Sequence, residues 1–248
     1  MLEIEFYFTC ENMNDPFTHG DETQQTCGNF YFHRTNGRLR TGNYKGVDIS
    51  IGNSSSEYGG ILVRSIEQLG FNPKVVCGPS KVVDHILHTC EMKEVQSLVD
   101  KMTDLSVKKG EEEKLMYLSP ASEVQVEQLH QFRVFSSARV GLFMTKTEAE
   151  ISMQEDFVFE EFRFFVNPKS LWKGKHLMAI SLHLQGKSLM EIESLLGAKL
   201  ASVKKHLHHF EEGKKIKVKH FHGRRLEGEE LICKCYGSVY NHNKQKKL

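Results

Sequence analysis

The sequence has no long apolar segment and no clustered cysteines. Its 248 residues contain no run of about 18 apolar residues, and the first residues lack the pattern of a signal peptide. We therefore expect a soluble, intracellular protein that has no membrane partner. The six cysteines are scattered, and the closest pair, Cys233 and Cys235, has the wrong spacing for a zinc knuckle. We expect reduced, structural cysteines, and neither a metal nor a cofactor.

An excess of charge of one sign is also missing, because 33 Lys and Arg nearly balance 32 Asp and Glu. A net charge of +1 excludes a polycation that binds nucleic acids through charge alone. The charges are nevertheless unevenly placed, with acids gathered in residues 148–161 and Lys, Arg and His gathered in residues 199–225. The length fits one large domain, or one domain with a small second one.

Short aromatic and β-branched segments predict a sheet in the first part of the chain. Residues 3–9 and 29–33 have the composition and alternation of strands. Because the strand period is two, Glu5 and Tyr7 are expected on one face of the first strand. Asn36-Gly37 then predicts a tight hairpin turn.

A charged residue, Arg64, interrupts an apolar run over residues 61–66. A buried strand tolerates a guanidinium only where it is paired or lines a cleft. Gly78-Pro79 predicts a turn, and Ser80 is expected to cap a helix over residues 81–87. The strand residue and the helix N-terminus would then lie close together, which suits the binding of water or anions.

Six segments resemble, in order, motifs of the alkyladenine (3-methyladenine) DNA glycosylase family. They cover residues 3–172, and His19 lies in a loop after the first of them, as the family's pocket histidine does. The resemblance implies an α+β fold, with a curved, mostly antiparallel sheet and surrounding helices, in a domain at residues 1–175. The six segments are EIEFY at 3–7, DIS at 48–50, LVRSIE at 62–67, CGPSK at 77–81, SARVG at 137–141, and FRFFV at 162–166 followed by Trp172.

The resemblance implies a monofunctional hydrolase that flips a damaged or alkylated purine out of double-stranded DNA and removes it in base-excision repair. Glu5 would activate the attacking water, Arg64 would hold that water and stabilise Glu5, and the carbonyl of Val140 would be the third water partner. Tyr7 and His19 would stack on the flipped base, with a cationic purine gaining cation–π attraction. The chemistry needs no metal, and we expect a monomer.

Several positions depart from the family's pattern. The chain begins almost at the catalytic strand, without the family's preceding β-elements, so we expect either a truncated N-terminus or a sheet that is closed differently. Thr41 stands at the position of the intercalating tyrosine, where a threonine cannot fill the gap left by an extruded base. Arg38, His33 or Tyr44 would have to replace it in contacting the DNA. The third aromatic residue of the family's pocket falls near Arg38, which could stack through its guanidinium plane or abolish the slot.

Asp48 stands where the family has an asparagine that disfavours guanine by crowding its exocyclic amine. An aspartate would instead accept a hydrogen bond from that amine, so we hypothesise a shift toward damaged guanine. Lys81, at the start of the expected helix, is a candidate ligand of DNA phosphate.

Ordinary structural roles remain open for these residues. Glu5 could be an exposed edge-strand carboxylate, Tyr7 a core residue and His19 a loop histidine. Lys81 could be a helix-surface lysine, and Arg64 could form a structural ion pair with Glu67 or Asp48.

The last part of the chain, residues 176–248, predicts a separate basic extension. Helices are expected over 177–184, after a capping box that starts at Ser188, and over 200–210, which together resemble a helix-turn-helix. Lys204 and Lys205 lie on the outward face of the third helix, where a recognition helix meets phosphates.

Residues 215–222 and 229–236 alternate like two strands of a wing around residues 223–225. The extension is expected to be a DNA-binding part of the repair enzyme, and two other interpretations stay open. It could be a solvated three-helix appendage, or the chain could be a catalytically inactive relative that binds DNA or protein through residues 176–240. A DNA substrate would place the protein in the nucleus of a eukaryote, or otherwise in the cytoplasm at the nucleoid.

Overall fold

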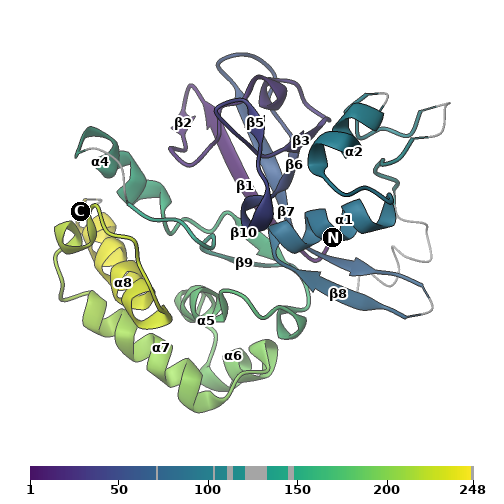
Figure 1. Cartoon of the computed structure of the whole chain (residues 1–248). Coiled ribbons are helices and arrows are strands. Elements are labelled where there is room, and N and C mark those ends of the chain that lie inside the picture. Colours follow the sequence, from purple (N-terminus) through teal and green to yellow (C-terminus); the bar gives the residue numbers. More distant parts are fainter. Residues whose placement is uncertain (71, 103, 111–113, 121–132, 145–147, 247–248) are drawn as a thin grey trace. The chain divides into compact units, whose positions relative to one another are not determined.

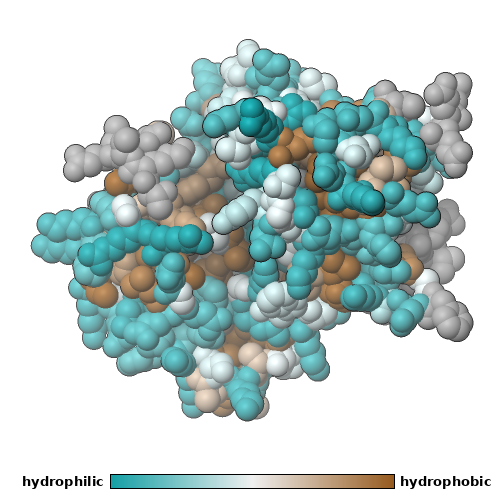
Figure 2. All heavy atoms as spheres, in the orientation of Figure 1, coloured by the Kyte–Doolittle hydropathy of each residue, from teal (hydrophilic) through white to brown (hydrophobic). Residues whose placement is uncertain are grey.

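The computed structural model describes the chain except for residues 71, 103, 111–113, 121–132, 145–147, 247 and 248 (Figure 1). Contacts divide the chain into two compact units. Unit 1 comprises Met1–Asn14 and Thr18–Arg133, and unit 2 comprises Asp15–Phe17 and Val134–Leu248. The fold is mixed α and β, and hydrophilic residues cover most of the visible face, with apolar residues in smaller patches (Figure 2). Among the described residues, no helix is long and apolar enough to cross a membrane.

Unit 1 is built on an antiparallel sheet with the strand order β3-β6-β7-β1, in which β2 pairs with β1 and β8 pairs with β7. The strands confirm the predicted sheet in the first part of the chain. Their bounds are β1 Glu3–Cys10, β2 Met13–Asn14, β3 Phe30–Phe32, β6 Val47–Ser50, β7 Tyr58–Gln68 and β8 Lys74–Cys77.

The predicted hairpin at Asn36-Gly37 is confirmed. Strands β4 (Arg34–Thr35) and β5 (Arg38–Leu39) pair on either side of these two residues, which both have positive φ. That backbone conformation is the one a two-residue type I′ turn requires, and Asn and Gly adopt it readily. Two short 3₁₀ turns complete the connections of unit 1, η1 (Glu22–Gln25) and η2 (Gly42–Tyr44).

One face of the sheet packs on helices α1 (Pro79–Thr89) and α2 (Val95–Lys101). Gly78, with a φ of 109°, precedes α1, while the Ser80 hydroxyl donates to the Gly42 carbonyl at 3.0 Å, so the predicted cap at Ser80 is wrong. The apolar core on this face consists of Phe30, Phe32, Val47, Val63, Val82, Val83, Leu87, Val95 and Leu98.

A β-bulge changes which side chains of β7 face the opposite side of the sheet. Glu3 pairs with Ser65 and Ile4 pairs with Val63, so Arg64 is an extra residue against β1. A bulge places two consecutive residues against one partner. Arg64 and Ser65 consequently both reach the Glu3 carboxylate, while Ile66 returns to the apolar core.

Unit 2 consists of one strand pair and a set of helices. Strands β9 (Phe135–Ser137) and β10 (Arg163–Phe165) are antiparallel; β10 lies within a segment that resembles the glycosylase family, and β9 ends at the first residue of another. The helical elements are α4 Glu148–Phe157, η3 Pro168–Ser170, α5 Lys175–Leu184, α6 Leu189–Leu196, α7 Leu200–Gly213, η4 Val218–Phe221 and α8 Glu229–Lys246. The predicted boundary at residue 175 falls inside this unit.

Helices α5, α6 and α7 confirm the three helices that the sequence predicts in the extension. Ser188 and Glu191 form the predicted capping box, in which each side chain bonds the backbone N–H of the other residue. Gly197 ends α6 in the left-handed conformation and allows the sharp turn into α7. The buried side chains that join these two helices are Ile192, Leu196, Val203, Leu207 and Phe210.

The predicted wing is wrong. Residues 229–236 begin the long helix α8, and residues 215–222 contain only the short turn η4. Helix α8 packs closely on α7 because two glycines remove side chains from the contact. A Cβ on Gly213 would lie 2.0 Å from the Lys234 carbonyl oxygen, and one on Gly237 would lie 1.9 Å from the Phe210 carbonyl oxygen. Residues 229–236 alternate like a strand in sequence, but they belong to a helix that packs against α7.

His176 gives unit 2 a predicted sensitivity to acid. Its side chain, on α5, is buried, and desolvation lowers its pKa to about 4 against the partial opposition of Glu229. Between about pH 6.5 and 4, His176 is protonated in the unfolded chain but stays neutral in the folded chain. The free energy of unfolding therefore falls as the pH falls. The loss reaches about 2–3 kcal/mol at pH 4.5.

Urea unfolding at pH 7.5 and pH 4.5 measures this loss. His176→Phe is expected to reduce the pH dependence, whereas the exposed His183→Gln should leave it unchanged. Equal pH dependence in wild type and His176→Phe would show that His176 is not the source.

Candidate functional site

The candidate site lies on the face of the unit 1 sheet that does not pack on α1 and α2. Four strands contribute directly opposed residues, because Tyr31 pairs with Asp48, Asp48 with Leu62, and Leu62 with Glu5. Directly opposed residues of an antiparallel pair project from the same face. The polar side chains predicted from separate motifs therefore gather in one row across the sheet.

Glu5 is at the centre of the first polar network. Its carboxylate is fully buried, and its Oε2 accepts hydrogen bonds from the Tyr7 hydroxyl at 2.8 Å and from Arg64 Nη1 at 3.1 Å. The alternation of β1 places Glu5 and Tyr7 on one face, as predicted. The reading of Glu5 as an exposed edge-strand carboxylate is wrong, since the side chain of Glu5 is fully buried.

Glu3 and Ser65 complete this network and were not expected to belong to it. Arg64 Nε donates to Glu3 Oε1 at 3.0 Å, and the Ser65 hydroxyl donates to Glu3 Oε2. The acids that pair with Arg64 are thus Glu3 and Glu5. The sequence did carry a signal, since Glu3 and Glu5 are two residues apart on one strand.

The network holds a charged guanidinium in a buried place. Burial by itself would lower the pKa of Arg64, but the carboxylates of Glu5 and Glu3 raise it above its ordinary value. A buried charge requires such partners and matching hydrogen bonds. Arg64 is therefore a buried cation that is paired with two carboxylates.

Asp48 forms a second polar network two strands away. Its Oδ1 lies 2.7 Å from His33 Nε2, and its Oδ2 accepts a bond from Gln24 Nε2 at 3.3 Å. Gly60 leaves room for this carboxylate, because a Cβ there would lie 2.6 Å from Asp48 Oδ2. Both oxygens are engaged, so a guanine amine would have to share one of them.

His19 belongs to this second network through its ring. The His19 and His33 rings meet edge to face with centroids 4.4 Å apart, and His19 Nδ1 lies 3.3 Å from the Tyr31 hydroxyl. Desolvation, followed by the positive charges of His33 and Arg40, lowers the pKa of His19 to about 4. Burial raises the pKa of Tyr31 to about 12. His19 is therefore largely neutral at physiological pH.

The structure places His33, and not Arg38, in contact with the second network, while the stacking role of Arg38 stays a prediction. Arg38 is exposed on the β4–β5 hairpin, while His33 contacts His19 and Asp48 directly. The sequence signal was present, since Tyr31 and His33 alternate onto the face that carries Asp48.

The remaining predicted residues lie outside the strands that carry these two networks. Val140 belongs to unit 2, where it lies against Gly174, and its part in holding water stays a prediction. Lys81 is exposed on α1, and Lys204 and Lys205 are exposed on α7. These positions are accessible to a phosphate backbone.

A surface hollow of about 450 Å³ lies over the segment that follows β3. Its lining includes both exposed Thr41 and exposed Tyr44, together with the side chains of the hairpin. The full lining is Thr35, Arg38, Leu39, Arg40, Thr41 and Tyr44, which contains two arginines and no acid.

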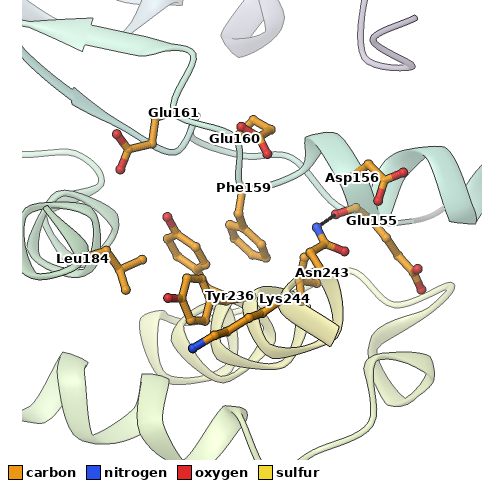
Figure 3. A pocket seen from close by; sticks show the side chains of 11 residues that line it. Glu155, Asp156, Phe159, Glu160, Glu161, Leu184, Tyr236, Asn243 and Lys244 are labelled. Atoms are coloured by element: carbon orange, nitrogen blue, oxygen red, sulfur yellow. Dashed lines mark hydrogen bonds between the residues drawn. The ribbon is translucent and has the colours of Figure 1, made fainter. Parts of the chain in front are cut away.

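Unit 2 has a pocket of a different character, with a volume of about 420 Å³ (Figure 3). The stacked rings of Phe159 and Tyr236, 4.4 Å apart, form part of its wall, and acids outnumber bases around it. Glu155 is already bound by His222 at 2.7 Å and His242 at 3.2 Å. Such a wall repels phosphate, so this pocket is not a nucleic-acid groove. Its acids are Glu155, Asp156, Glu160 and Glu161.

Among the residues with described positions, no group of three or more His, Cys, Asp or Glu side chains could hold a metal ion.

Comparisons with known proteins give one informative similarity. The chain is 29% identical over 155 residues to an uncharacterized protein, L759, of Acanthamoeba polyphaga mimivirus. The aligned region covers 57% of this chain and 68% of the viral protein. No family model matches the chain, and no solved structure matches it. The chain is thus similar to a viral protein that has no described activity.

Proposed function

We propose that this chain is a monofunctional DNA glycosylase that removes alkylated or otherwise damaged purines from double-stranded DNA in base-excision repair. The proposal joins the resemblance of six ordered segments to one geometric observation. A fully buried glutamate, Glu5, is held by a guanidinium and a tyrosine hydroxyl, two residue types the resemblance assigns to the same site. Such a protein would act as a monomer and, in a eukaryote, in the nucleus.

The reaction follows from the position of Glu5 beside Arg64. A purine must leave the base stack before its glycosidic bond becomes accessible. The oxygen of a water molecule then forms a bond to C1′ while the C1′–N bond breaks. The electron pair of the broken C1′–N bond leaves with the base. Glu5 takes the proton that the water loses, and Arg64, which donates to the Glu5 carboxylate, stabilises Glu5 electrostatically.

Tyr7 and His19 would hold the flipped base. Tyr7 carries its hydroxyl to Glu5, so its ring is next to the reacting centre, and His19 contributes a neutral imidazole. Stacking of bases on aromatic side chains tolerates different sequences, which suits an enzyme that searches for damage.

Single-turnover release of bases from an alkylated duplex tests the proposal. We expect the full chain to release 3-methyladenine or 7-methylguanine and to leave abasic sites that alkali cleaves. The matched undamaged duplex should stay intact. An absence of release across alkylated, deaminated and oxidised purines, with a correctly folded protein, would contradict the proposed reaction.

Asp48 gives a prediction about the preferred base. Each carboxylate oxygen has two lone pairs, so Asp48 can accept a hydrogen bond from guanine's exocyclic amine besides those from His33 and Gln24. A hydrogen bond to a charged group contributes about 1.5–3 kcal/mol, which is roughly 10- to 150-fold in relative rate. Asp48→Asn should therefore shift release from 7-methylguanine toward 3-methyladenine by that order. An adenine preference that is the same in both proteins would remove this role.

A second candidate function is a catalytically inactive relative that binds DNA through unit 2. The helix-turn-helix of α6 and α7 favours it, because Lys204 and Lys205 project into solvent from the second helix. Tight binding of an undamaged duplex without release of any base would select this alternative over the enzyme.

Lys204 and Lys205 are predicted to contact DNA phosphates under either function. Replacing both with Gln should reduce the slope of log affinity against log salt by about 2, since each phosphate contact contributes about 0.9. Lys234→Gln, which removes a lysine paired with Glu230, is the matched control. Binding titrations at several salt concentrations measure the slope, and an unchanged slope would exclude α7 from the interface.

A further inference from the structure

The pocket of unit 2 combines an apolar wall with acidic side chains, and neither candidate function uses it (Figure 3). Its volume of about 420 Å³ is within the range of pockets that hold small molecules. The wall includes the stacked rings of Phe159 and Tyr236, which are nearly parallel with centroids 4.4 Å apart. Leu184, Val239 and Tyr240 extend this apolar lining. Such a wall packs well against the carbon atoms of a ligand.

Glu161 gives one end of the pocket a negative charge that neutral groups hold in place. The Ser136 hydroxyl and Gln185 Nε2 both donate to Glu161 Oε2 at 2.8 Å. Neither donor is charged, so these hydrogen bonds fix the carboxylate without cancelling its charge. The charge is felt inside the pocket, because burial raises the pKa of the Tyr236 hydroxyl and the carboxylates of Glu161 and Glu160 raise it further.

Asp156 and Asn243 lie at the other end of the pocket, beyond the Phe159 ring (Figure 3). The Asp156 side chain is 53% exposed and lies 3.1 Å from Lys246 Nζ, and an exposed ion pair of this kind is weak and can exchange its cation. Asn243 Nδ2 donates to the Glu155 carbonyl at 3.1 Å, which orients the amide. Asn243 Oδ1 is buried and accepts no hydrogen bond from the described residues. Such an acceptor has a free-energy cost that a bound N–H donor would remove.

The two polar ends and the apolar wall between them define the chemistry of a ligand. Four acids line the pocket against one lysine, Lys244, so an anionic ligand would be repelled. A compact cation would satisfy only one end and would leave the aromatic wall in contact with water. A chain of methylene groups with an ammonium group near each end matches all three parts of the pocket.

We propose that the pocket of unit 2 binds a linear polyamine. One ammonium group binds Glu161, the methylene chain lies along the wall of Phe159 and Tyr236, and a second ammonium group reaches the end formed by Asp156 and Asn243. A lysine side chain of a partner protein is the less favoured occupant, because its one ammonium group can satisfy only one end. This site goes beyond the proposed function and does not depend on it.

Isothermal titration calorimetry on the full chain tests the site, with spermidine as the probe. The titration is run at low ionic strength, where salt screens the charges least. We expect saturable binding of one spermidine molecule per chain. Butylamine, which has a similar carbon chain but a single ammonium group, should bind at least about 10-fold more weakly, because it lacks the second charged hydrogen bond.

Three variants assign the binding to this pocket. Glu161→Gln keeps an acceptor oxygen for Ser136 and Gln185 but removes the charge, so the affinity for spermidine should fall roughly 10-fold. Lys244→Gln removes a cation from the lining and should raise the affinity up to about 5-fold. Glu67→Gln, which removes an exposed acid of unit 1, is the matched control and should bind as wild type does.

Several results would overturn the proposal. The absence of saturable binding would show that the pocket does not take a polyamine. Equal weakening by Glu161→Gln and Glu67→Gln would show only an unspecific attraction to surface charge. Butylamine that binds as tightly as spermidine would assign the pocket to a single ammonium group, such as that of a lysine side chain. The titration contains no DNA, so its outcome is separate from that of the base-release experiment.

Discussion

Glu5→Gln is expected to lower the single-turnover rate of base release about 10²–10⁴-fold, which is the usual contribution of a general base. The amide occupies nearly the volume of the carboxylate and can still accept a hydrogen bond from Tyr7 or Arg64. It cannot take a proton from the attacking water. DNA affinity should change little, because Glu5 is buried and makes its contacts with Tyr7 and Arg64 rather than with a surface.

The measurement compares rates at saturating enzyme on one alkylated duplex. Glu67→Gln is the matched control, since Glu67 lies on the same strand as Arg64 but is exposed near its end. A Glu5→Gln protein that releases bases at the wild-type rate would show that another group activates the water. If Glu67→Gln lowers the rate of base release as much as Glu5→Gln does, the loss would indicate general misfolding rather than a role of Glu5.

Local sequence patterns were sufficient for much of unit 1 and for the helices of unit 2. The hairpin at Asn36-Gly37 and the capping box at Ser188 depend on backbone preferences that a few neighbouring residues determine. The strands β1 and β3 follow from alternation over five to eight residues. Such features need no knowledge of the rest of the chain.

The wing could not be excluded from local patterns, because residues 229–236 alternate well enough for a strand. What decides for α8 is a tertiary contact, the close approach of α7 at Gly213 and Gly237. A glycine pair separated by more than twenty residues is invisible to a pattern read over a short window. Tertiary packing overrides local strand preference in such cases.

The sequence predicted several residues of the site, but not which of them contact one another. Arg64 in an apolar strand demanded acidic partners, and the bulge that supplies Glu3 as well as Glu5 depends on strand register. Val63 and Ile66 carried a hint, since two core residues three apart do not fit a regular strand. The contact of His33 with Asp48 likewise depends on the pairing of β3 with β6.

Arg64→Leu is expected to destabilise the protein by about 3–5 kcal/mol, the usual effect of removing one partner from a buried ion pair. The substitution leaves the carboxylates of Glu3 and Glu5 buried near each other, without the guanidinium that both of them contact. Denaturant unfolding measures the change in free energy, and Arg38→Leu, at an exposed position, should stay within about 0.5 kcal/mol of wild type.

A double-mutant cycle separates the charge effect from lost packing. Adding Glu3→Gln to Arg64→Leu removes one of the two uncompensated charges, so part of the stability should return, although Glu3→Gln alone should destabilise. Lost packing alone would instead make the two effects add. Recovery would show that Arg64 compensates the charges of Glu3 and Glu5, which is the electrostatic stabilisation that the proposed role of Glu5 as a base requires. Additive losses would mean that Glu5 does not depend on that guanidinium, and the water-activating role of the pair would lose its physical basis.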